Sequence, residues 1–416
     1  MIKPRHQSIQ AIYLFLTLLN TLATSMIWGI NTLFLLDAGL SNAQAFLANA
    51  FFTVGQVVFE IPTGIVADLK GRRLSYLLGT LTLAAATFLY LFAWMAHAPF
   101  WAWALSSLLL GLGFTFFSGA TEAWLVDALA FAGYPGELEA VFAKAQSVSG
   151  AAMLVGSVAG GLIAQNTDLG VPYILRAIFL LATFVLAFIF MKDWGFSPRK
   201  SASLGQDMKA LFVDSFELGL RKPAIRWVML AAPFASGVGF YVFYAMQPHL
   251  LALYGDPTAY GIAGLAATIV AGSQILGGLI APLVRQLFRH RTTGLLLGEI
   301  AVVAVLTLLG LLTSFWAAIV FLCAWGLLFA AIAPIRQAYL NAHIPSEQRA
   351  TVLSFDALLG SSGGVVVQPA LGRVADLYSY ATSFLIGAAV QAIAIPFAFL
   401  ARNQELRPAG QSQVKD

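Results

Sequence analysis

The chain has 416 residues, of which 59% are hydrophobic and only 10% are charged, and its formal net charge is +4. A soluble domain needs roughly a quarter of its residues charged, so this composition excludes a soluble protein and predicts apolar surface in contact with lipid. Basic loops beside an anionic leaflet explain the positive charge, so we expect no nucleic-acid partner. The single cysteine, Cys323, excludes an internal disulfide and a cysteine-based metal site.

Apolar stretches long enough to cross a bilayer, which takes about 20 residues as a helix, recur along the chain. In the first half they cover residues 9–36, 43–67, 74–95, 99–126, 138–164 and 172–191. In the second half they cover residues 224–253, 258–285, 292–313, 315–342, 348–375 and 380–401. Unpaired backbone groups in hydrocarbon cost several kcal/mol each, and no alternating pattern of a β-barrel is present. The sequence therefore predicts an all-α membrane protein with twelve transmembrane helices in two pseudo-symmetric six-helix bundles.

The longest polar stretch divides the chain into predicted domains. It covers residues 192–222 and is expected to be a cytoplasmic linker with an amphipathic helix on the membrane surface. The remaining predicted domains are an N-terminal bundle (1–191), a C-terminal bundle (223–401) and a cytoplasmic tail (402–416). Short echoes at matching positions of the halves, such as residues 122–125 against 337–340, indicate an internal duplication.

Basic residues fall almost entirely on one side of this pattern. Of the 23 lysines and arginines, only Arg176 and Arg373 lie at the face opposite the N-terminus. This bias predicts that both termini are cytoplasmic. The absence of an N-x-S/T acceptor favours a prokaryotic origin, so we expect a multi-pass protein of the bacterial plasma (inner) membrane.

The connection between the second and third predicted helices carries the most specific pattern. It reads Gly-Ile-Val-Ala-Asp-Leu-Lys-Gly-Arg-Arg over residues 64–73. Glycine permits a tight turn, and the aspartate can accept hydrogen bonds from the arginines. The pattern resembles the signature of the major facilitator superfamily and departs from it at Leu69, where that family has a basic residue. The matching residues are Gly64, Asp68, Gly71, Arg72 and Arg73.

This resemblance covers essentially the whole chain and implies a transporter in which the loop takes part in gating. It also implies that Asp127, at the cytoplasmic end of the fourth helix, is the acid that meets the first arginine of the motif. The alternative is that the basic cluster only sets membrane topology.

A second partial match lies in the fifth predicted helix, where small residues resemble a glycine-rich motif of the family's antiporters. The residues are Ala152, Gly156, Ser157, Gly160 and Gly161. Ser157 stands where that motif has proline. Small residues four apart also let helices approach closely, so packing explains them equally well.

Five charged residues lie within apolar spans, where an ionised group costs roughly 2.5 to 3.5 kcal/mol. They are Glu60, Glu122, Glu299, Arg336 and Asp356. One interpretation makes an acid, above all Glu60 or Asp356, a proton carrier that drives transport. The other makes the set an inner gate of ion pairs, with Glu122 meeting Arg336 across the axis of the repeat.

Milder polar side chains follow a stripe of the first predicted helix and recur in the seventh, where we expect them to line a substrate cavity. They are Asn20, Thr24, Trp28, Asn31, Tyr241, Tyr244, Gln247 and His249. Interfacial anchoring or core packing is the alternative for the aromatic members, and a hydrogen-bonded packing role is the alternative for His249. No cluster of basic side chains accompanies the set, which disfavours a strongly anionic, phosphorylated substrate.

A nucleotide-binding loop of the G-x-x-x-x-G-K-[ST] kind does not occur, so a gradient must supply the energy of transport. The drug-efflux branches that the chain resembles imply proton-coupled export of small amphipathic organic compounds by alternating access. Uptake or facilitated diffusion of a small metabolite, and lipid flipping, remain open. No catalytic signature is present, so we expect no enzyme activity. We expect a monomer in the lipid bilayer with a small-molecule substrate and protons as partners, and with no cofactor and no metal.

Overall fold

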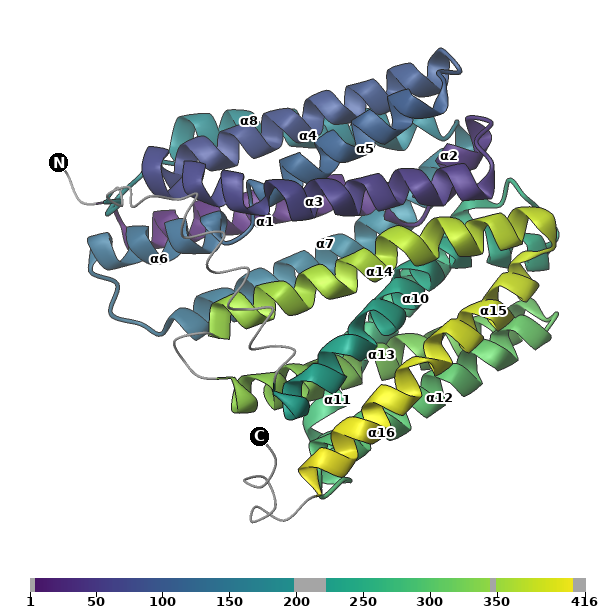
Figure 1. Cartoon of the computed structure of the whole chain (residues 1–416). Coiled ribbons are helices and arrows are strands. Elements are labelled where there is room, and N and C mark those ends of the chain that lie inside the picture. Colours follow the sequence, from purple (N-terminus) through teal and green to yellow (C-terminus); the bar gives the residue numbers. More distant parts are fainter. Residues whose placement is uncertain (1–3, 198–221, 345–348, 407–416) are drawn as a thin grey trace. The chain divides into compact units, whose positions relative to one another are not determined.

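The computed structural model describes residues 4–197, 222–344 and 349–406 (Figure 1). The described backbone is helical apart from short connections and contains no strand. By length and apolar composition it holds eleven candidate membrane spans, so the prediction of an all-α, multi-pass membrane protein is confirmed. The predicted amphipathic helix of the linker, and the tail beyond Leu406, lie outside the described residues.

The chain divides into two compact units. Unit 1 contains α1 to α8 and the first part of α11 up to Thr268. Unit 2 contains α10, the rest of α11 and α12 to α16. The grouping therefore assigns residues 254–268, which follow the seventh predicted span, to unit 1.

Unit 1 is built from helices that pack along their length: α3 lies against α5, α1 against α7 and α8, and α4 against α5 and α8. Its helices are α1 (His6–Trp28), α2 (Asn31–Asp37), α3 (Asn42–Lys70), α4 (Arg72–Met95), α5 (Phe100–Thr115), α6 (Ala120–Ala132), α7 (Leu138–Asn166) and α8 (Gly170–Phe190). A buried cluster around Tyr76 and Trp124 joins α1, α4, α6, α7 and α8.

In unit 2, α12 packs against α13, α15 and α16, and α14 packs against α15. The helices are α10 (Pro223–Tyr254), α11 (Tyr260–Gln286), α12 (Arg291–Leu311), α13 (Phe315–His343), α14 (Arg349–Leu377), α15 (Tyr380–Ala392) and α16 (Ala394–Glu405). The helix predicted over residues 348–375 is present as α14, but α14 is not among the eleven candidate spans. It is rich in glycine and serine, which lowers its apolar character.

Two predicted spans of unit 1 are broken in the structure. The first is interrupted at Gly29 and Ile30, where a side chain on Gly29 would lie 2.9 Å from the Cα of Gly264. The fourth is interrupted after Thr115 and restarts at Gly119, which has a left-handed φ of 65°. Continuous apolar composition hides such breaks, because both sides of each break are equally hydrophobic.

Large apolar side chains are exposed along the helices, as expected for a surface that faces lipid. Phe92 is 68% exposed and Leu279 is 70% exposed. The polar side chains described next are the exceptions inside these apolar helices.

Candidate functional site

The motif loop forms a tight turn between α3 and α4. Gly71 has a φ of 110°, which a residue with a side chain rarely adopts. Across this turn Arg72 forms an ion pair with Asp68, four residues earlier. The neighbouring Arg73 donates from Nη2 to the carbonyl oxygen of Phe188 at 2.7 Å. The loop thus joins α3, α4 and the end of α8.

Asp193, which the sequence reasoning missed, completes the motif loop. Its Oδ1 accepts a hydrogen bond from the backbone N–H of Arg73 at 2.8 Å, at the N-terminus of α4. Its carboxylate also fills the space that a side chain on Gly71 would need. A carboxylate at this place is favourable because it satisfies a free N–H and meets the positive end of the helix dipole. The available signal was an acid directly after the sixth apolar stretch.

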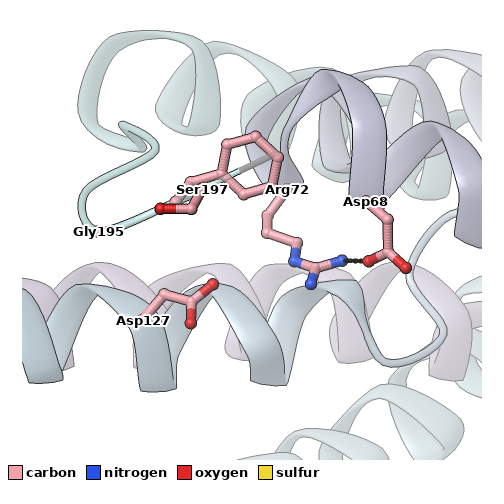
Figure 2. A pocket seen from close by; sticks show the side chains of 6 residues that line it. Asp68, Arg72, Asp127, Gly195 and Ser197 are labelled. Carbon is pink, nitrogen blue, oxygen red and sulfur yellow. Dashed lines mark hydrogen bonds and ion pairs between the residues drawn. The ribbon is translucent and has the colours of Figure 1, made fainter. Parts of the chain in front are cut away.

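A pocket of about 400 Å³ opens beside the motif (Figure 2). It is lined by Asp68, Arg72, Asp127, Gly195, Phe196 and Ser197. Figure 2 shows the guanidinium of Arg72 turned toward Asp68, with Asp127 on the neighbouring helix α6. Among the described residues, Asp68 and not Asp127 forms the ion pair with Arg72. The contact that the resemblance implies for Asp127 is therefore not made in this structure.

The two acids predicted inside the membrane in unit 1 lie on exposed helix faces. Glu60 is exposed, and its Oε1 accepts a hydrogen bond from the hydroxyl of Ser118 at 2.5 Å. Glu122 is exposed in the first turn of α6. Its pairing with Arg336 stays a prediction.

In unit 2 the predicted charges form two sets of polar contacts. Arg336 of α13 holds Asp356 of α14 through two hydrogen bonds of 2.6 Å, one from each terminal nitrogen. Its Nη2 also donates to the carbonyl oxygen of Val228 on α10 at 3.3 Å. Two parallel bonds between a guanidinium and a carboxylate make the strongest kind of ion pair.

The third predicted charge of unit 2, Glu299 on α12, is half-buried. Its Oε2 accepts a hydrogen bond of 2.5 Å from the amide of Gln391 on α15. Gln391 is only 3% exposed and was missed from the sequence, although an amide within an apolar span is a visible signal. The two sets of contacts, called the polar network of unit 2, join α13 with α10 and α14, and α12 with α15.

The polar stripe of the first predicted helix is split by the break between α1 and α2. Thr24 donates to the carbonyl oxygen of Asn20 within α1, while Trp28 ends this helix. Asn31 opens α2 and belongs to a different network. It donates from Nδ2 to Oδ1 of Asn49 at 3.0 Å and accepts at Oδ1 from the hydroxyl of Tyr173 at 2.9 Å.

The corresponding residues of α10 are mostly packed into unit 2. Tyr241, Gln247 and His249 are at most 3% exposed. Tyr241 is hydrogen-bonded to Ser383, and the ring of His249 lies tilted against that of Phe384 with centroids 4.9 Å apart. The packing alternative therefore has contacts for Tyr241 and His249, although Nε2 of His249 has no hydrogen-bond partner among the described residues. Tyr244 is half-buried and meets Phe243 edge to face.

The small residues of α7 are used in close packing within unit 1. A side chain on Gly156 would collide with Ser25, and one on Gly160 would collide with the carbonyl of Met26. On the same helix, a side chain on Gly161 would lie 3.1 Å from the Cα of Gly264. These contacts account for the pattern without any statement about the direction of transport.

Comparison with known families decides the class of protein. The family model of the Major Facilitator Superfamily matches residues 13–366. The chain belongs to this superfamily. Its members are transporters, so the family places the chain among transport proteins.

Solved structures of other transporters share the fold of this superfamily member. It is similar to the nucleoside transporter NupG, with a TM-score of 0.76 and 12% identity, covering 96% of this chain and 100% of that one. It is also similar to a bacterial homolog of the human lysosomal transporter Spinster, with a TM-score of 0.73 and 17% identity, covering 97% and 98%. A POT family transporter in complex with a thioalcohol-conjugated peptide gives a TM-score of 0.69 at 13% identity, covering 95% and 96%. None of the curated proteins compared with the chain matches it.

Proposed function

We propose that this superfamily member is a secondary active transporter that exports small amphipathic organic compounds in exchange for protons by alternating access. The observation that carries the proposal is the polar network of unit 2. It contains two carboxyl groups, Glu299 and Asp356, and one guanidinium, that of Arg336. Since Arg336 is paired with Asp356, Glu299 is left with a neutral amide as its hydrogen-bond partner.

A carboxyl group that no guanidinium holds is the better candidate for exchanging a proton during transport. Glu299 would ionise when Arg336 turned toward it, and it would take up a proton when Arg336 returned to Asp356. Such an exchange couples a proton to a change of conformation. Glu299 is therefore the preferred proton carrier among the predicted acids. The carboxylate of Asp356 is held by Arg336, and Glu60 is exposed.

We assign the motif loop to the gate of unit 1. Arg72 can form a strong pair with one acid at a time, and Asp127 lies across the pocket from its present partner Asp68. A shift of Arg72 between these acids would change the contacts of α6 during transport. Gly64, Gly71 and Arg73 complete the proposed gating motif, and Glu122 is kept as a member of the inner gate.

The rest of the proposed architecture follows the sequence. We take α14 as the twelfth span, because its 29 residues reach about 43 Å at 1.5 Å per residue, beyond the roughly 30 Å of the hydrocarbon core. The proposal includes two pseudo-symmetric six-helix bundles, a monomer, cytoplasmic termini and a bacterial inner membrane. The proposed cavity residues stay those of the two polar stripes: Asn20, Thr24, Trp28, Asn31, Tyr241, Tyr244, Gln247 and His249.

Uptake of a small metabolite is the second candidate. The antiporter-like residues of α7 are occupied in helix packing, which removes the sequence argument for export. The resemblance of fold to a nucleoside transporter is compatible with either direction.

Transport by the purified protein in liposomes tests the proposal. A panel of labelled amphipathic compounds is followed with an imposed pH gradient of either sign, and with the gradient collapsed by a proton ionophore. We expect the transported compound to move in the direction opposite to the proton flow, at least tenfold faster than when the gradient is collapsed. Movement in the same direction as protons supports uptake, and movement that ignores the gradient rejects proton coupling.

A further inference from the structure

The loop between α11 and α12 joins the second and third predicted spans of the second half, as the motif loop joins α3 and α4 in the first half. Three arginines make it strongly basic. Arg285 lies in the last turn of α11, Arg289 lies in the loop itself, and Arg291 is the first residue of α12. No acidic residue occurs in the sequence from Pro282 to Gly298. The loop therefore contains no acid of its own that could pair with these arginines.

The contacts of the three arginines leave their positive charge in place. Nη1 of Arg285 donates to the carbonyl oxygen of Phe288 at 2.5 Å, and Nη1 of Arg291 lies 3.5 Å from the carbonyl oxygen of Ala338. Arg289 is exposed. Within the described part of the chain, none of the three forms an ion pair with a carboxylate. A carbonyl oxygen occupies one N–H donor of a guanidinium but does not neutralise it.

The acid that lies beside this loop, Glu405 at the end of α16, has other partners. Its Oε2 accepts hydrogen bonds from the backbone N–H of Thr292 at 3.1 Å and from the hydroxyl of the same residue. Its Oε1 lies 3.8 Å from Nδ1 of His290. In the motif loop of unit 1, by contrast, Arg72 is paired with Asp68. The two loops therefore differ in that the loop of unit 2 presents unpaired cationic groups.

A ridge of exposed leucines leads along α11 to this loop. Leu279 is 70% exposed, Leu283 is 62% exposed and Leu287 is 77% exposed. The spacing of four residues makes successive leucines neighbours on the helix surface, and Leu287 follows directly after the helix ends at Gln286. Since α11 is a candidate membrane span, we expect the ridge to lie against acyl chains. Arg289 follows Leu287 by two residues, which places it where long basic side chains reach the headgroup region.

We propose that the α11–α12 loop binds the headgroup of an anionic phospholipid, with an acyl chain of that lipid along the leucine ridge of α11. A phosphodiester supplies the negative charge that the loop lacks, and guanidinium groups bind phosphate oxygens through paired N–H donors. Clusters of basic residues at the ends of membrane helices attract anionic lipids for this reason. A soluble anion gains nothing from the leucines, and a zwitterionic headgroup carries an ammonium group that arginines repel. The inference goes beyond transport and is independent of its direction and coupling.

Fluorescence quenching at the end of the ridge tests this inference. The full-length Leu287→Cys variant in a Cys323→Ser background carries one bimane label, because Cys323 is the only cysteine of the chain. The protein is placed in nanodiscs with equal amounts of phosphatidylglycerol and phosphatidylcholine, and only one of the two lipids carries quenching bromine atoms on its acyl chains. We expect brominated phosphatidylglycerol to quench as though it were at least about threefold enriched around the label. Equal quenching by the two lipids overturns the proposal.

A label in unit 1 is the matched control. Leu74 is exposed on α4, beside the motif loop in which Arg72 is paired with Asp68. The same label on Leu74→Cys should be quenched almost equally by the two lipids. If phosphatidylglycerol is enriched there as strongly as at Leu287, the enrichment is a general property of this end of the helices, and the assignment to the α11–α12 loop is wrong.

Substitutions locate the preference within the loop. Arg289→Gln should lower the enrichment of phosphatidylglycerol at Leu287, and Arg289→Lys should keep most of it because the charge remains. Both should melt at the original temperature, since Arg289 is exposed. Lys70→Gln, which removes the same charge beside the motif loop, should leave the enrichment unchanged. Full enrichment in the double variant Arg285→Gln/Arg289→Gln would contradict the role given to the arginines.

Inorganic phosphate separates a lipid site from a site for a soluble anion. An excess of phosphate at constant ionic strength should leave the enrichment at Leu287 in place, because free phosphate makes no use of the leucine ridge. Loss of the enrichment would mean that the loop binds a soluble anion, and the proposal would be wrong. Failure of proton coupling in the liposome assay would not change the quenching ratios, and equal quenching would leave the proposed transport function intact.

Discussion

The two units treat an arginine of a membrane-spanning helix in opposite ways. Unit 2 gives Arg336 an acid through two hydrogen bonds of 2.6 Å and holds a second acid, Glu299, on α12. Unit 1 leaves Arg176 with only a hydroxyl and a carbonyl oxygen. Several acids of unit 1, among them Asp68 and Asp193, instead lie around the motif loop.

This difference indicates different roles for the two arginines. A cation paired with one acid beside a second acid can exchange partners, which suits a proton-linked switch. A cation with only neutral partners has no second acid with which to exchange and is held in place by hydrogen bonds and packing. Four substitution experiments test this comparison. The first two change the charged residues of unit 2, and the last two change the motif loop of unit 1.

Breaking the pair of unit 2 is expected to have the largest effect. Arg336→Gln leaves the buried carboxylate of Asp356 without its partner, which lowers stability by about 3 kcal/mol, whereas Asp356→Asn frees a guanidinium that is only partly buried and should cost less. Gradient-driven transport should be lost in both variants. The double substitution Arg336→Gln/Asp356→Asn should recover most of the melting temperature but not the transport. If the double variant melts as early as the single ones, the pair does not act as a unit.

Removing the proton site alone should uncouple transport from the gradient. Glu299→Gln keeps the size of the side chain and removes the exchangeable proton, so accumulation driven by a pH gradient should fall at least tenfold. Exchange of labelled for unlabelled substrate across the membrane should continue. The matched control is Glu60→Gln, which should retain coupling, because Glu60 is exposed and lies outside the network. Full coupling in Glu299→Gln would contradict the proposed carrier.

The glycines of the motif loop should differ from each other. Gly71→Ala forces a side chain into a φ of 110° and against Asp193, so stability should fall by roughly 2 kcal/mol. Gly64→Ala meets open space inside α3 and should leave the melting temperature unchanged or slightly higher. Thermal unfolding of both variants in detergent measures the difference. Equal destabilisation of the two would show that the turn geometry is not what constrains Gly71.

The smallest effect is expected at Asp193. Asp193→Asn keeps an oxygen that accepts a hydrogen bond from the N–H of Arg73 but loses the negative charge at the N-terminus of α4. Loss of that charge should lower the free energy of unfolding by about 0.5 to 1 kcal/mol. Asp193→Ala should cost about 1 kcal/mol more, since the N–H then has no acceptor. The difference between the two melting temperatures separates hydrogen bonding from charge. No change in either variant would remove Asp193 from the account of the motif loop.

Much of the fold could be predicted because long apolar stretches of sequence identify membrane helices. The motif loop could also be predicted, because Asp68, Gly71 and Arg72 lie within a few residues of one another in the sequence. Partners from distant segments could not be found in this way. Gln391 and Glu299 are 92 residues apart, and Asp193 and Arg73 are 120 residues apart, so only the packing of helices brings them together.

The substrate stripe shows a second limit of sequence reasoning. Helical periodicity placed Asn31 with Thr24 and Trp28, but it assumed one straight helix where the chain turns at Gly29. The same periodicity gave no reason to pair Asn31 with Asn49, which lies on a different helix. Arg176 was noticed as an exception in charge distribution, yet its burial depends on how α8 packs against α1 and α4.

The interruption between α5 and α6 has a mechanical consequence. At this elbow the hydroxyl of Ser75 bonds the carbonyl oxygen of Phe116, and the hydroxyl of Ser118 bonds Glu60. The hydroxyl of Ser75 on α4 thus takes the place of a backbone N–H that a straight helix would offer to Phe116, whereas the bond between Ser118 and Glu60 links two side chains. We expect the segment that carries Asp127 to tilt relative to α5 at this interruption more easily than an unbroken helix would bend.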